Sequence, residues 1–258
     1  MKKIINCILF LSFSCLLINA QETINTIKVE YDLILNTDFP VQKKGELIIS
    51  NKLNQSIFYE VLENKENKII EEDGKIRVIV SDKNVRFNHT DFNKNILISS
   101  ESASNDEFNV TEPIPSFQWK LQDSTKIIGN FECKLATSSF RGRNYFAWYT
   151  ENYPLKFGPW KFNGLPGLIV NAYDDSRRYI WSLTGLKTDS IPFNKYLASV
   201  ENKLDTLSIE EFVQKKYGSD LNARLISKLP RNTSFKVSQT IRNGKEIRFE
   251  WEEEDQKD

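Results

Sequence analysis

Alternating apolar and polar residues dominate the chain and predict a protein built mainly from β-strands. The first such segment places its apolar residues at every second position: Ile27, Val29, Tyr31, Leu33 and Leu35. A period of two is typical of a strand that buries one face. Shorter segments of similar character follow at 46–50, 57–62, 75–80 and 96–100, bounded by clusters of Asn, Asp, Gly or Lys.

The same alternation continues through the centre of the chain. Between Lys126 and Leu135, Cys133 falls on the apolar side together with Ile127 and Phe131, so its thiol is expected to point inward. A turn at 141–144 and a return through the aromatic segment 145–150 predict a hairpin. A second hairpin is expected between 168–173 and 179–184.

Helix signals are confined to a short insertion near residues 190–230. Ser208 and Glu211 have the spacing of a capping box, and Gly218 is placed to end that helix. A second helix is predicted over 221–229.

Strand character returns after this insertion, at 235–241 and 246–251. Asn243-Gly244 between the two segments is a dipeptide favoured in tight hairpin turns. The order of elements predicts a mainly β fold: a curved antiparallel sheet, as an incomplete barrel or a sandwich, with a short helical insertion.

The first 20 residues have the layout of a secretory signal peptide. Met1-Lys2-Lys3 is followed by an apolar run from Ile4 to Ile18, and polarity rises after Ala20. The run is shorter than the roughly 20 residues of a membrane-spanning helix. We therefore expect cleavage, export to the periplasm or cell surface, and a single β-rich domain over 21–258 without a transmembrane segment.

Composition narrows the chemistry of the mature chain. Removing 20 of the 258 residues leaves 238, with 33 basic and 35 acidic residues because two lysines leave with the signal. This balance gives no support for nucleic-acid binding, which favours a basic face. Cys133 is the remaining cysteine and His89 the single histidine, so we expect no internal disulfide, metal site or cofactor.

The segment Gly164-Leu165-Pro166-Gly167-Leu168-Ile169 combines a turn with the start of an apolar strand. Pro166 and Gly167 fit the central positions of a type II turn, in which the glycine adopts a positive φ. The string resembles the namesake motif of the GLPGLI family, exported proteins of Bacteroidota without an established biochemical function. Flanking matches include Arg141-Gly142-Arg143, Ala147-Trp148-Tyr149-Thr150 and Gly158-Pro159-Trp160.

Two groups of residues are candidates for ligand binding. Arg141 and Arg143 could grip a phosphate or carboxylate, or they could form a polar turn with salt bridges to the sheet. Four aromatic residues could line a groove or fill the core: Trp148, Tyr149, Trp160 and Phe162.

These features leave three functional hypotheses open. The first is a non-catalytic module that binds or carries a lipid, peptide or small hydrophobic ligand. The second is an accessory partner of an outer-membrane receptor or secretion system, which predicts an exposed apolar patch near 160–169. The third is an enzyme that uses Cys133 or the pair Arg141 and Arg143, although the apolar position of Cys133 favours a packing role.

Overall fold

The computed structural model describes residues 26–61, 68–72, 75–79, 85–103, 106–201, 203–218 and 242–252. The predicted signal peptide, the helix predicted over 221–229 and the strand predicted over 235–241 lie outside these ranges.

Strands dominate the described part of the chain, as the alternating pattern predicts. Twelve of them form one sheet in the order β14-β8-β7-β6-β3-β2-β1-β13-β12-β11-β10-β9, and β4 and β5 pair separately. The strands are β1 (Thr26–Leu35), β2 (Val41–Ser50), β3 (Gln55–Val61), β4 (Lys68–Glu72), β5 (Lys75–Ile79), β6 (Phe87–Asp91), β7 (Ile96–Ala103), β8 (Asp106–Glu112), β9 (Lys120–Ile128), β10 (Phe131–Phe140), β11 (Arg143–Thr150), β12 (Leu168–Asp174), β13 (Tyr179–Asp189) and β14 (Thr206–Ser208).

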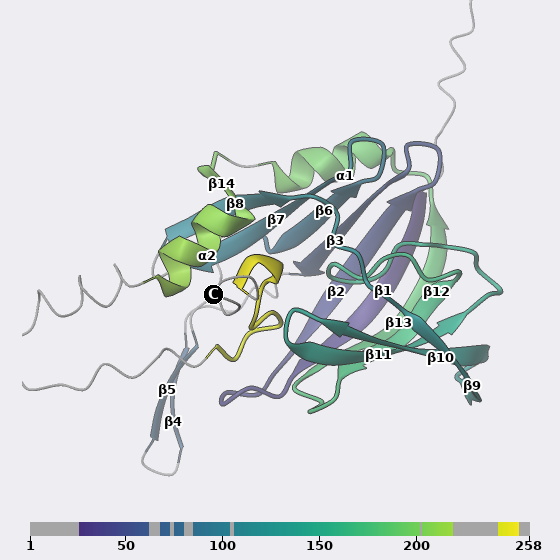
Figure 1. Cartoon of the computed structure of the whole chain (residues 1–258), viewed down its shortest axis with the longest axis horizontal. Coiled ribbons are helices and arrows are strands. Elements are labelled where there is room, and N and C mark those ends of the chain that lie inside the picture. The colour runs from purple at the N-terminus through teal and green to yellow at the C-terminus, as the bar shows by residue number, and fades with distance from the viewer. Residues whose placement is uncertain are drawn as a thin grey trace, which may run out of the picture.

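The sheet is curved and does not close into a barrel, which confirms the predicted fold class. Its neighbouring strands are antiparallel, except that β14 runs parallel to β8. Strands β14 and β9 form the two edges. Figure 1 shows the β9–β11 end of the sheet lying across from the β6–β8 end, so that the sheet partly surrounds the segment 242–252.

Two short helices lie in the predicted insertion and cover opposite faces of the sheet. Helix α1 (Phe193–Val200) packs on Ile48 and Ile57. Helix α2 (Ile209–Tyr217) packs on Phe108 and Val110 of the other face. The predicted capping box is confirmed: the Ser208 hydroxyl accepts from the Glu211 amide, the Glu211 carboxylate accepts from the Ser208 amide, and Gly218 is the C-cap.

The main core lies on the same face of the sheet as α2. Val29, Tyr31 and Leu33 of β1 are fully buried there, at the alternate positions that the sequence predicts. Aromatic residues from the loop between β11 and β12 pack onto them, and the Tyr31 hydroxyl donates to the Ile169 carbonyl at 2.7 Å. The loop is therefore part of the core.

The alternation at 126–135 is interrupted by a turn, which corrects the interpretation of this stretch as one continuous strand. Gly129, with a φ of +58°, lies in the connection between β9 and β10. Ile127 consequently lies on the exposed edge strand, with 77% of its surface accessible, whereas Cys133 on β10 is fully buried as predicted. Across the turn Ile127 pairs with Glu132 and Lys126 pairs with Cys133, so odd-numbered residues change faces between β9 and β10. The sequence pattern does not show this change, because β9 is almost wholly exposed and its apolar residues do not follow the core.

Two further local predictions are wrong. Residues 246–251 do not form a strand but an irregular segment that ends in a turn of 3₁₀-helix at 250–252. The positive φ belongs to Gly164, at +85°, and not to Gly167. Gly167 is needed for another reason, because a Cβ there would lie 2.1 Å from the Thr150 carbonyl oxygen.

Candidate functional site

A cavity of about 400 Å³ lies between the inner face of the sheet, α2 and residues 242–252. We call it the central cavity and the residues 242–252 the C-terminal segment. The lining residues are Leu35, Lys43, Glu60, Arg86, Phe87, Asn88, Ser100, Glu101, Ser102, Trp160, Tyr179, Ile209, Phe212, Lys216, Tyr217, Gly244, Lys245, Glu246 and Phe249. Its volume falls within the range of about 300–1,000 Å³ that is usual for small-molecule sites.

Aromatic rings form one part of the cavity lining. Trp160 stacks on the buried Trp181 with ring centres 5.8 Å apart, and Tyr179 stacks on Trp181 in turn. The backbone of Trp160 has a φ of +54°, a conformation that costs roughly 1–3 kcal/mol in a bulky residue. The side chains packed around Trp160 stabilise this strained backbone conformation. The next residue is Lys161, whose cationic side chain is buried.

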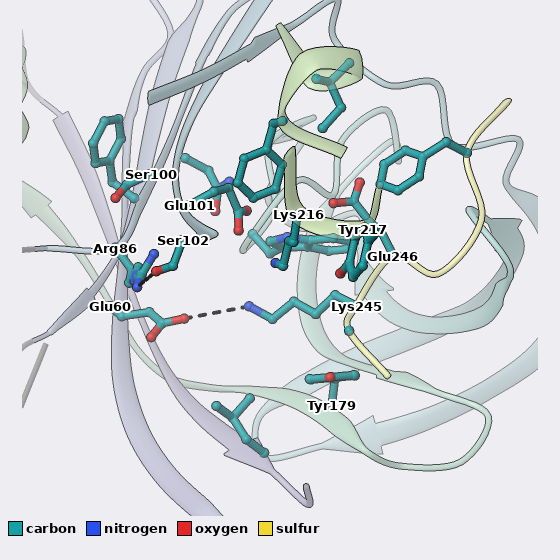
Figure 2. Close-up of a pocket in the computed structure, with 18 of the residues that line it drawn as sticks. Glu60, Arg86, Ser100, Glu101, Ser102, Tyr179, Lys216, Tyr217, Lys245 and Glu246 are labelled. Atoms are coloured by element: carbon teal, nitrogen blue, oxygen red, sulfur yellow. Dashed lines mark hydrogen bonds and ion pairs between the residues drawn. The ribbon is translucent and has the colours of Figure 1, made fainter. Parts of the chain in front are cut away.

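One carboxylate of the lining is neutralised by two lysines. Glu60 lies 2.8 Å from the Lys43 ammonium and 3.7 Å from the Lys245 ammonium, the second pair reaching across the cavity as Figure 2 shows. Burial opposes the charge of Glu60, but Lys245 and Lys43 outweigh it and lower the pKa of the carboxyl below its ordinary value. The Lys245 ammonium also lies 5.8 Å from the centre of the Trp181 ring.

Two other charged groups of the lining have no ion pair within the described residues. Glu101 of β7 and Lys216 of α2 both project toward the hollow in Figure 2. Lys216 contacts the rings of Phe212 and Tyr217 at 5.1 and 5.5 Å. Both side chains are partly buried. The charge of Glu101 also helps to raise the pKa of Lys161. The cavity therefore presents one carboxylate and one ammonium that have no ion-pair partner in the described part of the fold.

A buried ionic cluster borders the cavity at Glu246. The Lys161 ammonium, with 1% of its side chain exposed, lies 2.6 Å from Glu112 and 2.8 Å from Glu246. Arg141 contacts Glu112 at 2.6 Å and also pairs with Glu246. Burial opposes the charge on Lys161, but Glu246 and Glu112 outweigh it and raise its pKa above the ordinary value. Burial likewise opposes the charge on Glu246, whose pKa is nevertheless lowered by Lys161 and Arg141.

The two candidate arginines hold the C-terminal segment. The Arg141 carbonyl accepts from the amides of Ile247 and Arg248, and the Arg143 guanidinium donates to the Gly244 carbonyl at 2.7 Å. Arg143 also pairs with the buried Asp174 at 2.9 Å. Arg141 and Arg143 thus form a polar turn with salt bridges. The groups that this turn binds belong to a segment of the same chain.

The four candidate aromatic residues do not meet in one groove. Trp160 lines the central cavity, whereas Phe162 and Tyr149 are buried in the main core with 2% and 1% of their surface exposed. Trp148 lies in a separate cluster with Cys133. Neighbouring residues of β11 point to opposite faces of the sheet, which separates Trp148 from Tyr149.

Cys133 and the single histidine, His89, lie away from the cavity lining. Cys133 is fully buried beside Trp148 and Val170, and burial raises the pKa of its thiol. His89 packs near Phe193 of α1, and burial lowers its pKa. Among the described residues, no group of three or more His, Cys, Asp or Glu side chains could hold a metal ion.

Most of the charged residues around the cavity and the cluster escaped sequence reasoning. Lys161 carries the one clear signal, since a lysine between Trp160 and Phe162 in an apolar stretch requires a buried partner. Its partners Glu112 and Glu246 are 49 and 85 positions away along the chain. Nothing in the sequence pattern connects residues at such separations.

Comparison with known proteins finds that part of this region is similar to a family of unknown function. Residues 142–171 match the family described as "Protein of unknown function (Porph_ging)". These residues run from the turn after Arg141 to the middle of β12 and include Trp160 and Lys161. No curated protein sequence matches the chain.

Structures of one known protein share the fold at low sequence identity. Two structures of PNGF-II, in the C2 and P21 space groups, superpose with TM-scores of 0.51 and 0.52 at 15% identity. The match covers 76% of this chain but 33% and 34% of those chains, so the chain corresponds to about a third of their length. An uncharacterized conserved protein from Thermus thermophilus gives a TM-score of 0.39 at 6% identity, over 73% of this chain and 98% of that one.

Proposed function

We propose that the protein is exported and works in the periplasm or at the cell surface as one domain spanning residues 21–258. The layout of residues 1–20 supports this, and within the described residues no helix is long and apolar enough to cross a membrane. Sequencing the amino terminus of the protein recovered from its host should find Gln21 or a neighbouring residue first. Recovery of the uncleaved chain from the cytoplasm would refute the proposal.

We further infer membership of the GLPGLI family from the string Gly164–Ile169 and its ordered flanking matches. The match of residues 142–171 to a family of unknown function spans the same motif and supports a shared origin for this region. It supplies no activity.

The activity we propose is non-catalytic binding or carriage of a small ligand in the central cavity. The observation that carries this proposal is a hollow of about 400 Å³ whose lining combines aromatic rings with uncompensated charges. Such a mixture is typical of sites that orient a ligand by a few polar groups against an apolar surface. The burial and raised pKa of Cys133, remote from this lining, argue against the thiol enzyme.

Filling the cavity tests this function directly. Ser102→Trp places a large ring in the lining, and Ser139→Trp places the same ring on an exposed position of β10. A panel of amino acids, peptides, sugars and lipids is screened by thermal shift and native mass spectrometry on residues 21–258. We expect a ligand that stabilises the wild type and the Ser139→Trp protein but not the Ser102→Trp protein. Equal binding to all three proteins, or no binding at all, would refute a cavity ligand.

The alternative, an accessory partner of an envelope receptor or secretion system, finds support at a different surface from the one expected. The predicted apolar patch near 160–169 is absent, since Trp160, Leu165 and Ile169 are each at most 4% exposed. The edge strand β9 instead exposes Leu121 and Ile127, at 58% and 77%. An exposed edge can pair with a strand of another protein.

Crosslinking in the host tests this second candidate. A partner captured by the wild type should be lost from the double variant Leu121→Lys/Ile127→Lys and kept by the Ser102→Trp protein. Loss through Ser102→Trp alone would assign the contact to the cavity instead.

A further inference from the structure

The charges of the central cavity restrict the class of ligand that it can accept. A purely anionic ligand would meet the carboxylates of the lining, which belong to Glu60, Glu101 and Glu246. A purely cationic ligand would meet its basic side chains, which belong to Lys43, Arg86, Lys216 and Lys245. A long acyl chain would have to bury these charged groups without compensating them, which is costly. The ligand that avoids all three penalties carries both signs of charge.

The positions of the charged groups without an ion-pair partner indicate where the positive and negative groups of a ligand would lie. Glu101 on β7 provides a carboxylate and Lys216 on α2 provides an ammonium, neither of which forms an ion pair with a described residue. Lys245 adds a second ammonium, held at 3.7 Å from Glu60, a separation longer than that of a direct hydrogen bond. Lys245 can therefore turn toward a ligand while Lys43 continues to neutralise Glu60 at 2.8 Å.

The remaining lining is suited to an apolar side group. Trp160 and Tyr179 present rings to the hollow next to Lys245. A hollow of about 400 Å³ accommodates a molecule of dipeptide size.

We propose that the central cavity binds a small zwitterion, an amino acid or a short peptide. Its ammonium group pairs with Glu101, its carboxylate pairs with Lys216 and Lys245, and its side group packs on Trp160. This inference rests on the proposed binding function and specifies its ligand class.

Three forms of one dipeptide test the inference. Alanyl-phenylalanine, its N-acetyl derivative and its C-terminal amide are titrated into residues 21–258, with calorimetry and tryptophan fluorescence as readouts, and free phenylalanine distinguishes an amino acid from a peptide. Because a hydrogen-bonded ion pair is lost in each blocked form, the free dipeptide should bind at least about tenfold more tightly than either.

Variants assign each charge. Glu101→Gln should bind the free and acetylated peptides equally, because the partner of the ammonium is gone. Lys216→Met should weaken the free peptide and reduce its advantage over the amide, while Lys245 retains part of it. Glu132→Gln on an exposed position of β10 and Lys215→Met on the exposed face of α2 are matched controls that should behave as the wild type.

The outcomes separate the inference from the function on which it rests. If the three peptide forms bind equally, or fail to bind while another compound of the panel is excluded by Ser102→Trp, the zwitterion is wrong and the binding function stands. If Ser102→Trp abolishes the binding of no compound, the zwitterion and the binding function are both wrong. A discrimination that survives Glu101→Gln would also overturn the assigned geometry.

Discussion

The buried ionic cluster and the lining of the central cavity contain the same kinds of charged side chain but differ in whether these side chains are paired. In the cluster, Lys161 and Arg141 each contact both Glu112 and Glu246 at hydrogen-bonding distance. In the lining, Glu101 and Lys216 have no such partner among the described residues. Burial of charge therefore does not mark a binding site by itself. The distinguishing property is whether the fold already supplies the opposite charge.

The cluster has a structural consequence that Glu101 and Lys216 lack. It joins three distant parts of the chain: Glu112 at the end of β8, Lys161 in the loop before β12, and Glu246 in the C-terminal segment. An ion pair in a protein interior contributes little net stability but carries a severe cost when broken. We infer that the cluster fixes the position of the C-terminal segment, and with it one wall of the cavity.

Removing the central cation should cause the largest effect. Lys161→Met leaves two buried carboxylates without their shared ammonium, and we expect a loss of about 3–5 kcal/mol in the free energy of unfolding. Urea denaturation followed by circular dichroism measures it. Lys134→Met is the control, because the exposed pair of Lys134 with Glu151 at 2.7 Å is screened by solvent and should contribute far less to stability. Equal effects of the two substitutions would remove the distinction between the regions.

The turn that holds the C-terminal segment can be perturbed without changing charge. Gly142→Ala and Gly129→Ala both place a Cβ on a backbone with positive φ, at a cost of about 1–2 kcal/mol each. At Gly142 the new Cβ would also lie 2.6 Å from Ile247, whereas at Gly129 nothing lies within 4 Å. We expect the additional destabilisation at Gly142 to release the C-terminal segment, seen as faster tryptic cleavage after Arg242 or Lys245. Equal cleavage in both variants would show that Gly142 does not position the segment.

Lowering the pH should gradually weaken the attachment of the C-terminal segment and the stability of the fold. The pKa values of Glu246 and Glu60 are lower in the folded protein than in the unfolded chain. Their contributions are therefore present above the unfolded value of about 4.3 and are lost as the pH falls through the folded values. The lowered pKa of His89 adds a loss that begins below its unfolded value of about 6.5.

At alkaline pH the stability changes in the opposite direction, because the raised pKa of Lys161 gives a contribution that is lost as the pH rises. Its contribution persists until the pH rises through the folded value, above about 10.4, whereas the raised pKa of the Cys133 thiol costs stability above its unfolded value of about 8.5. Stability should therefore be level between about pH 7 and 8 in a pH series of thermal unfolding. A fall in thermal stability within that pH interval would contradict the assignment of these pKa shifts.

Local pattern predicted the architecture because its determinants are local. The alternation at 27–35, the capping box at Ser208 and Glu211, and the hairpin turn at 174–177 each depend on residues a few positions apart. The turn at Gly129 was missed because Ile127 is exposed on the edge strand, so an apolar residue there continues the pattern without facing the core.

The site was less predictable because its charges come from distant strands. Arg141 and Arg143 stood out in sequence as potential ligand grips, yet their backbone partners lie about a hundred positions away, in the C-terminal segment. Their carboxylate partners are between 29 and 109 positions away. Glu101 and Lys216 stood out in no way, since partly polar strands and helix ends contain many such residues. Whether a charge is compensated depends on the tertiary fold.

Removing an uncompensated charge should have the smallest effect on stability. Glu101→Gln keeps the shape of the side chain and breaks no ion pair with a described residue, so we expect a change within about 0.5 kcal/mol in urea denaturation. Glu60→Gln is the informative counterpart, because it removes the shared partner of Lys43 and Lys245 and should cost more. A large loss from Glu101→Gln would mean that the fold already uses this carboxylate, and the division between structural and available charges would then fail at the residue where it matters most.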